Sequence, residues 1–178
     1  MDILFELIRG FWIIIPAYAA NGFAPMANGH RRIDFGKKFF GKPLFGAGKT
    51  WEGLLFSVFI GTLCGLVQIY AHPYLNPMAL EEGFSLQALS IYSVFFVALG
   101  AMLGDILGSF IKRRVGMKRG ESLLLGDQLD FLLIGFLFAS VFMEVSILSV
   151  LIFLIITPII HRTACFLGYK LGLKREPW

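Results

Sequence analysis

The chain has 178 residues, of which 57% are hydrophobic and only 16% are charged, with a formal net charge of +4. An ordinary soluble domain has about a quarter of its residues charged, so this composition excludes that class. Apolar runs of about 20 residues, long enough to cross a bilayer, occur several times. The sequence therefore predicts an all-α integral membrane protein that forms a single membrane-embedded domain over residues 1–178.

We expect five membrane spans, with approximate bounds at residues 4–25, 53–71, 89–111, 123–143 and 146–166. The first span contains Pro16, which membrane helices tolerate when neighbouring helices satisfy the freed backbone groups. The fourth span is the least regular, because Asp127 and Asp130 lie in its first turns.

The cations are divided unevenly between the segments that connect these spans. Fifteen of the sixteen Lys and Arg residues lie in segments 26–52, 112–127 and 162–178, whereas segment 72–88 holds none. The positive-inside rule assigns the cation-rich side to the cytoplasm. We therefore expect a multi-pass protein of the cell membrane, with its N-terminus outside, its C-terminus cytoplasmic and its site formed by the cytoplasmic loops 26–52 and 112–127. Topology and attraction to anionic lipids already explain the basic tail.

The first basic loop ends in GAGKTWEG, residues 46–53. It is not a P-loop, because Pro43 stands where that motif requires its first glycine and no strand precedes it. As a glycine-rich turn before a helix, it can still bind phosphate through backbone N–H groups, Lys49 and Thr50. Glu52 can orient a cation or a nucleotide hydroxyl. The alternative is a flexible loop in which Thr50 only caps the following helix.

Asp105 lies inside the third expected span, in LGDILGSFIKRR, residues 103–114. A carboxylate at membrane depth is costly unless it has a partner or faces a polar cavity. Ser109 and Lys112 follow at i+4 and i+7, on the same helical face. One interpretation is an Asp105–Lys112 ion pair at the helix end, and the other is a functional carboxylate.

The segment GDQLD, residues 126–130, favours the functional interpretation, because Asp127 and Asp130 share one helical face where the chain re-enters the membrane. Together with Asp105 they form a set of carboxylates that suits Mg²⁺, which prefers oxygen ligands and completes its shell with substrate phosphates. Between these acids lie cations of the kind that hold a polyphosphate: Lys112, Arg113, Lys118 and Arg119. The pattern predicts a Mg²⁺–polyphosphate site.

GDILGSFIKRR followed by GDQLD resembles the signature of the membrane CTP:phosphatidate cytidylyltransferases, the CDP-diacylglycerol synthases. That signature reads approximately S-x-x-K-R, four residues, K-D, and later H-G-G-x-x-D-R-x-D. The matching positions are Ser109, Lys112, Arg113, Lys118, Asp127 and Asp130. The segment KTWEG, residues 49–53, resembles a second block of the family.

Several features depart from the bacterial signature. Arg119 stands where the signature has Asp, Gln128 stands where it has Arg, and the His-Gly-Gly is absent. These departures, together with PAYAANG (16–22) and IDFGKKF (33–39), resemble the archaeal branch of the family, the CDP-archaeol synthases. Asp105 is then expected to supply the carboxylate that the signature has elsewhere.

The resemblance implies transfer of a cytidylyl group from CTP to 2,3-di-O-geranylgeranylglyceryl phosphate, an unsaturated archaeal ether-lipid phosphate, with release of pyrophosphate in phospholipid biosynthesis. It implies Mg²⁺ as the cofactor, with Asp105, Asp127 and Asp130 as ligands. These acids, Lys112 and Arg113 are the expected catalytic residues. The residues expected to bind CTP and lipid phosphates are Lys49, Thr50, Glu52, Ser109, Lys118 and Arg119.

Other functions fit parts of the pattern. A CDP-diacylglycerol synthase acting on ester lipids and a CTP-dependent lipid kinase would use a similar site. A small transporter or lipid-binding membrane protein would place polar residues deep in several spans, whereas here the acids gather at one end of two spans. Nucleic-acid binding is not expected, because the basic loops adjoin membrane spans.

Overall fold

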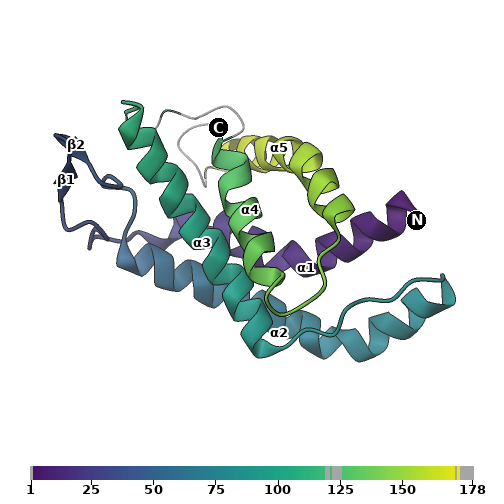
Figure 1. Cartoon of the computed structure of the whole chain (residues 1–178). Helices are drawn as coiled ribbons and strands as arrows, with labels where there is room; N and C mark the ends of the chain where they lie inside the picture. The colour runs from purple at the N-terminus through teal and green to yellow at the C-terminus, as the bar shows by residue number, and fades with distance from the viewer. Residues whose placement is uncertain (1, 119–120, 122–125, 171, 173–178) are drawn as a thin grey trace.

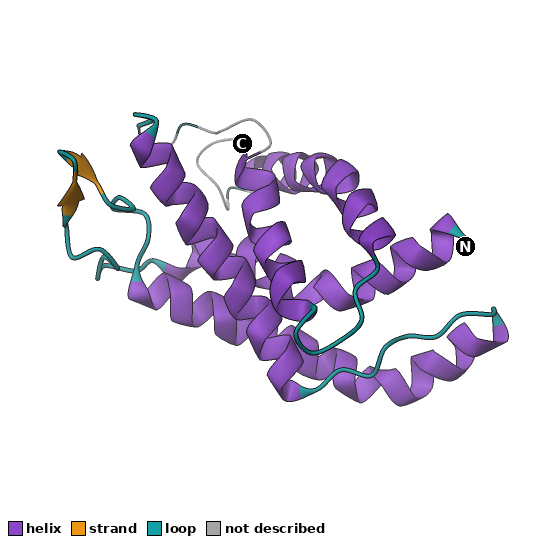
Figure 2. Ribbon diagram, in the orientation of Figure 1, coloured by secondary structure: helices purple, strands orange, loops and turns teal. Residues whose placement is uncertain are grey.

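The computed structural model describes residues 2–118, 121, 126–170 and 172, and these form a helical bundle with a small hairpin at one end (Figures 1 and 2). The elements are α1 (Ile3–Phe23), the 3₁₀ helix η1 (Ala24–Ala27), β1 (Lys38–Phe39), β2 (Lys42–Pro43), α2 (Trp51–Glu81), α3 (Ile91–Arg114), α4 (Gly126–Ala139) and α5 (Ile147–Lys170). The expectation of an all-α membrane protein is confirmed.

Four of the described helices, α1, α2, α3 and α5, are long and apolar enough to cross a membrane. Helix α4 has 14 residues, fewer than the roughly 20 that a full crossing requires. The fourth expected span, 123–143, is therefore helical only over Gly126–Ala139 among the described residues, and the chain turns after Ala139. The orientation of the termini stays a prediction.

Helix α2 is longer than the sequence suggests. The expected span ended at residue 71 with a connection over 72–88, but the helix continues to Glu81. Tertiary contacts stabilise this extension, because the Asn76 side-chain oxygen accepts a hydrogen bond from the Leu86 N–H at 2.9 Å, and the His72 ring bonds the Leu86 carbonyl at 3.0 Å. The returning chain thus packs along the last turns of α2.

Side-chain caps determine where α2 and α3 begin. Thr50 Oγ1 accepts a hydrogen bond from the Gly53 N–H at 3.1 Å, which satisfies one of the free donors at the start of α2. Ser90 and Ser93 form a reciprocal capping box at the start of α3. Thr50 thus caps α2, as the alternative interpretation of its motif has it.

Helices α3 and α4 pack closely through small residues. A Cβ atom added at Gly104 of α3 would overlap the backbone of Asp130 and Phe131 in α4. Small residues let helix backbones approach in this way inside membranes. The buried core beside this contact includes Ile14, Ala17, Val97, Ala101, Leu132 and Phe153. The start of α4, with its aspartates, is therefore held against the C-terminal half of α3.

The segment expected as a loop, 26–52, contains a β-hairpin that lies at the left of Figure 1. Its paired residues are Lys38 with Pro43 and Phe39 with Lys42. The turn residues Phe40 and Gly41 both have positive φ angles, 48° and 77°, as a type I′ hairpin turn requires. Arg114 joins the hairpin to the end of α3, since its guanidinium donates hydrogen bonds to the carbonyls of Phe39, Lys42 and Pro43.

Candidate functional site

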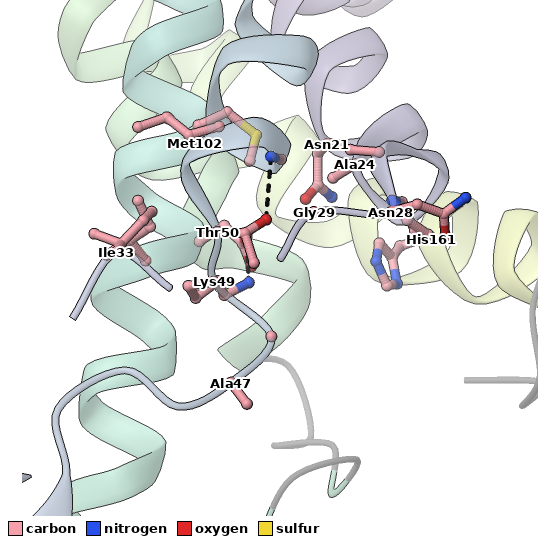
Figure 3. A pocket seen from close by; sticks show the side chains of 17 residues that line it. Asn21, Ala24, Asn28, Gly29, Ile33, Ala47, Lys49, Thr50, Met102 and His161 are labelled. Carbon is pink, nitrogen blue, oxygen red and sulfur yellow. Dashed lines mark hydrogen bonds and ion pairs between the residues drawn. The ribbon is translucent and has the colours of Figure 1, made fainter. Parts of the chain in front are cut away.

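A cavity of about 450 Å³ lies where α1, η1, the loop before α2, α3 and α5 meet (Figure 3). Three of the predicted site residues line it, namely Lys49, Thr50 and Asp105. Its other polar lining side chains come from three different elements: Asn21, Asn28 and His161. The cavity thus joins segments that are far apart in the sequence.

Asp105 forms an ion pair with Lys49. Both side chains are partly buried, with exposed fractions of 23% and 22%. The described ion-pair partner of Asp105 is therefore Lys49 from the loop before α2, rather than a cation one or two turns further along α3. Because the pair lines the cavity, it offers a positive and a negative group to a bound molecule at the same place.

The loop that carries Lys49 is anchored by an antiparallel pairing with the chain after η1. The Ile33 N–H bonds the Lys49 carbonyl at 2.9 Å, and the Trp51 N–H bonds the Arg31 carbonyl at 2.9 Å. The Glu52 carboxylate accepts hydrogen bonds from the Arg31 N–H at 3.1 and 3.3 Å. Glu52 therefore holds the loop in place through backbone contacts.

Thr50 is buried between this loop and the start of α2. Its hydroxyl oxygen accepts the capping bond from Gly53, drawn as a dashed line in Figure 3. A Cβ atom at Gly29 would overlap the Thr50 side chain and come within 3.0 Å of a Glu52 carboxylate oxygen. The glycine at position 29 thus allows the two chain segments to close on each other at the rim of the cavity.

The two remaining acids of the predicted metal site lie on α4. The Asp130 carboxylate packs against α3 so closely that a methyl group at Gly108 would overlap it. Gly108 is three residues after Asp105, so Asp130 contacts α3 about one helical turn from Asp105. Asp127 lies one turn before Asp130 in α4, and its side chain lies outside the described part of the structure.

The described side chains include no group of three His, Cys, Asp or Glu residues placed to hold a metal ion. A Mg²⁺ ion is often held by only one or two carboxylates together with substrate phosphates. The Asp105 carboxylate lies on α3, and the Asp130 carboxylate of α4 lies against α3 about one turn away, so hard oxygen ligands come from both helices. This donor chemistry fits Mg²⁺, and the full ligand set with Asp127 stays a prediction.

The other predicted site residues follow along the end of α3. Ser109 is buried and Lys112 is half-buried. Arg113 donates hydrogen bonds to the carbonyl oxygens of Met117 at 2.6 Å and Lys118 at 3.3 Å. Arg113 and Lys118 line a second cavity of about 480 Å³, between the hairpin and α3. The expected phosphate ligand Arg119 lies outside the described residues.

Asp34, which is not among the predicted site residues, has a structural part in this region. It is only 4% exposed and accepts hydrogen bonds from the backbone N–H groups of Gly36, Phe45 and Gly46. Burial raises the pKa of this carboxyl, but the three backbone hydrogen bonds and the charge of Arg32 outweigh burial, so the pKa lies below its usual value. Asp34 therefore remains ionised and ties both ends of the hairpin segment together.

Three cavity residues, Asn21, Asn28 and His161, were not among the predicted site residues. A signal existed for the two asparagines, because they flank the end of an otherwise apolar span. His161 gave no such signal, since it reaches the cavity only through the packing of α5. In Figure 3, Asn28 and His161 lie on the side of the cavity away from Lys49.

Comparison with known proteins bears directly on this site. The family CarS-like, CDP-archaeol synthase, matches residues 1–178. A CDP-archaeol synthase from Pyrobaculum calidifontis is 41% identical over 177 residues, covering 97% of this chain and 99% of the relative. The CDP-archaeol synthases of Pyrococcus horikoshii and Archaeoglobus fulgidus are 38% and 39% identical, each covering 97% of this chain and 98% of the relative.

A solved structure of an intramembrane enzyme for archaeal membrane lipids biosynthesis is also similar, with a TM-score of 0.75 and 31% identity. The match covers 89% of this chain and 93% of that chain. These similarities confirm the resemblance seen in the motifs and the expected enzyme class, a nucleotidyltransferase. The chain belongs to the CDP-archaeol synthase family.

Proposed function

We propose that this chain transfers a cytidylyl group from CTP to 2,3-di-O-geranylgeranylglyceryl phosphate in the cavity lined by Lys49 and Asp105. Family membership supports the reaction. One observation supports the place: a partly buried ion pair that faces a polar cavity at the end of otherwise apolar helices. Such a pair is expected where a membrane enzyme handles a charged substrate.

Cytidylyl transfer to a lipid phosphate does not require a strong general base. An oxygen of the lipid phosphate attacks the α-phosphorus of CTP and forms a new P–O bond. The bond from that phosphorus to the oxygen bridging the β-phosphorus breaks, and its electron pair leaves with pyrophosphate. A phosphate monoester, whose second pKa is about 6, is already anionic at neutral pH. The main barrier is the approach of two anions, so positioning and charge neutralisation carry most of the catalysis.

The protein groups have the following proposed roles. Lys49 contacts a phosphate of CTP or of the lipid, and Asp105 orients Lys49. Thr50 contributes its hydroxyl and Glu52 keeps the loop in position through Arg31. Further phosphate contacts are proposed for the residues at the end of α3 and beyond it: Ser109, Lys112, Arg113, Lys118 and Arg119. The lipid tails enter laterally between the helices, and the phosphates lie at the cytoplasmic face.

Mg²⁺ is the proposed cofactor, with Asp105, Asp127 and Asp130 as its ligands. When bound, Mg²⁺ would neutralise phosphate charge and favour in-line geometry. The contact of Asp130 with α3 supports this assignment, because it brings a second carboxylate to the helix that carries Asp105.

Two radioactive forms of CTP test the reaction. Purified protein receives the ether-lipid phosphate and CTP labelled either at the α- or at the γ-phosphorus. Cytidylyl transfer puts the α-label into the lipid and the γ-label into pyrophosphate, and both require a divalent cation. A CTP-dependent kinase would instead put the γ-label into a lipid, and a transporter would label no lipid.

Substrate choice is tested by offering phosphatidate, an ester lipid, beside the ether-lipid phosphate. Preference for phosphatidate would contradict the proposed substrate. Full activity in Asp105→Asn or Asp127→Asn would contradict the proposed site, with Glu82→Gln, an exposed carboxylate at the end of α2, as the matched control.

A further inference from the structure

The β-hairpin presents phenylalanine side chains at its turn. Phe40 is 87% exposed and Phe39 is 47% exposed, and their rings meet edge to face with centroids 4.6 Å apart. The backbone of Phe40 has a φ of 48°, a left-handed conformation that glycine adopts without strain and that is uncommon for a bulky residue. A strained turn that exposes an aromatic ring indicates that the ring has a contact outside the chain.

The hairpin lies beside the last turns of α3. Its strands pack on α3 and on no other described helix, and Figure 1 shows them next to the end of α3. The Phe39 ring centroid is 6.3 Å from that of Phe110 in α3, and the Arg114 guanidinium lies near both rings. Lys42 Nζ donates a hydrogen bond to the Arg114 carbonyl at 2.9 Å. The hairpin therefore extends sideways from α3 at the level of its C-terminal end.

This end of α3 is where its apolar surface gives way to charge. Leu103, Leu107 and Ile111 are exposed at intervals of four residues, which places them on one face of the helix. In a helix long and apolar enough to cross a membrane, such a face contacts acyl chains. Phe110 borders this face, and the cations 112–114 follow it directly. The hairpin, packed on Phe110, thus lies where acyl chains meet headgroups.

The charge of the hairpin suits an anionic lipid surface. Segment 37–42 contains three exposed lysines, Lys37, Lys38 and Lys42, and no acid. Exposed aromatic rings beside lysines are typical of segments that lie in the headgroup region, where the rings enter the apolar boundary and the ammonium groups meet lipid phosphates. A second copy of the hairpin is a poor partner, because a symmetric contact would bring like charges together.

We propose that the hairpin turn inserts the Phe40 ring into the headgroup region of the adjoining leaflet, with its lysines contacting anionic phospholipid. The turn is joined to the candidate site, because the Leu44 N–H bonds the Lys37 carbonyl at 3.0 Å and Asp34 accepts bonds from the Phe45 and Gly46 N–H groups. The inserted hairpin therefore holds the loop that carries Lys49 at the level of the lipid phosphates. This consequence for catalysis rests on the proposed function, whereas the insertion does not.

A nitroxide label tests the insertion without any substrate. The two native cysteines, Cys64 and Cys165, are replaced by alanine, and Phe40→Cys is labelled in phosphatidylcholine vesicles with or without phosphatidylglycerol. Electron paramagnetic resonance measures collisions with oxygen, which concentrates in the bilayer, and with a water-soluble nickel complex. Glu82→Cys, at the exposed end of α2, is the control position. We expect the oxygen-to-nickel ratio to be several-fold higher at position 40 than at position 82, and to rise further with phosphatidylglycerol.

Activity variants test the consequence for the lipid substrate. Phe40→Ser removes the apolar ring, and Phe40→Leu keeps an apolar side chain at the same position. In vesicles, Phe40→Ser should raise the KM for the lipid phosphate by up to about tenfold, whereas Phe40→Leu should stay close to the unmodified protein. Neither variant should change the KM for CTP or for a short-chain, water-soluble analogue of the lipid phosphate. A purely structural role of Phe40 would change these two constants as well.

The outcomes separate the insertion from the proposed function. A label at position 40 that meets the nickel complex as readily as the label at position 82 would overturn the inference. Magnetic coupling between labels on two copies, without contact with lipid, would make the turn an interface between copies and would also overturn it. If position 40 is inserted but the unmodified protein transfers no cytidylyl group, the insertion stands and the proposed function fails.

Discussion

Lys49 and Asp105, 56 residues apart in the sequence, form an ion pair at the wall of the candidate cavity. The pair explains how an apolar helix tolerates a carboxylate at this depth, because an opposite charge offsets its desolvation. It also connects the loop before α2, which is held by backbone bonds to Ile33 and Arg31, to α3. A movement of either partner would therefore change both the shape and the charge of the cavity.

Neutralising one member of this pair should abolish most activity. We expect Asp105→Asn and Lys49→Gln each to lower kcat/KM about 100-fold or more, since each removes a positioned charge and leaves its partner unpaired. The transfer assay with α-labelled CTP measures this loss.

The double variant Lys49→Gln/Asp105→Asn separates stability from catalysis. Because it leaves no uncompensated charge, its Tm should exceed that of either single variant while its activity stays low. Recovery of activity together with stability would mean that the pair is only structural. Glu82→Gln again serves as the control carboxylate.

Adding one methyl group at Gly108 should disturb the Asp130 carboxylate. Gly108→Ala places a Cβ atom where that carboxylate lies, so Asp130 must move away from α3. If Asp130 is a Mg²⁺ ligand, kcat/KM should fall about tenfold or more, and the Mg²⁺ concentration for half-maximal activity should rise. Titration of activity with Mg²⁺ measures both changes.

The matched control is Gly22→Ala in α1, where a Cβ atom meets nothing within 4 Å. It should leave activity unchanged and raise stability slightly, by roughly 0.5–1 kcal/mol, because alanine loses less backbone entropy in a helix. An unchanged Mg²⁺ requirement in Gly108→Ala would argue against Asp130 as a ligand.

The Asp34 carboxylate should make the free energy of unfolding depend on pH. Its pKa is lowered in the folded protein from an ordinary value of 3.8. The contribution of this carboxylate to the free energy of unfolding is therefore complete above about pH 3.8. It is lost as the pH falls through the lowered pKa of the folded protein. Asp34→Asn should lower the free energy of unfolding by about 1–3 kcal/mol near neutral pH, and by progressively less as the pH falls below the ordinary pKa of 3.8.

Thermal unfolding of both proteins between neutral pH and pH 3 measures this difference. Asp34→Asn should also loosen the hairpin segment, because the amide cannot replace a charged acceptor of three backbone bonds. Glu82→Gln, with an exposed side chain, provides the comparison. A Tm difference that does not shrink as the solution becomes acidic would contradict the assigned role.

Arg114 should hold the hairpin in its folded conformation. Its guanidinium donates to three hairpin carbonyls and lies 5.3 Å from the Phe39 ring centroid and 5.1 Å from that of Phe110. Lysine cannot reproduce this planar set of donors. Arg114→Lys should therefore expose the bonds after Lys37 and Lys38 to trypsin, with cleavage about tenfold faster or more.

Trypsin cleaves after both Lys and Arg, so the substitution adds no new cleavage site at position 114. Arg162→Lys, on the exposed face of α5, makes the same chemical change elsewhere and should leave hairpin cleavage unaltered. The cut positions are identified by mass spectrometry. Equal cleavage rates in the two variants would show that other contacts hold the hairpin.

Local patterns predicted the parts of the structure that depend on neighbouring residues. The apolar runs indicated the membrane helices, and Thr50 indicated the start of α2. The extension of α2 to Glu81 was missed, because Pro73 and Pro77 are usual helix-breaking signals and contacts with Leu86 outweigh them. The hairpin was missed because strands of two residues show no alternation.

The site was predictable in its residue types but not in its pairings. The motifs pointed to Lys49, Thr50 and Asp105, and all three line one cavity. Lys112 was one candidate partner of Asp105, because it lies on the same helical face, and the described ion pair of Asp105 is made by Lys49. The lining by Asn28 and His161 depends on where η1 and α5 pack, and sequence spacing carries no information about that.

The sequence alone determined that this chain is a helical membrane protein of the CDP-archaeol synthase family, because a bilayer imposes a minimum length on apolar helices and the family motifs are contiguous. Only the tertiary structure decided which cation meets Asp105, how Asp130 approaches α3 and that cations of the hairpin segment and the end of α3 line a second cavity. Charged side chains find partners through helix packing and loop geometry, and contacts over such sequence distances are set by the fold as a whole.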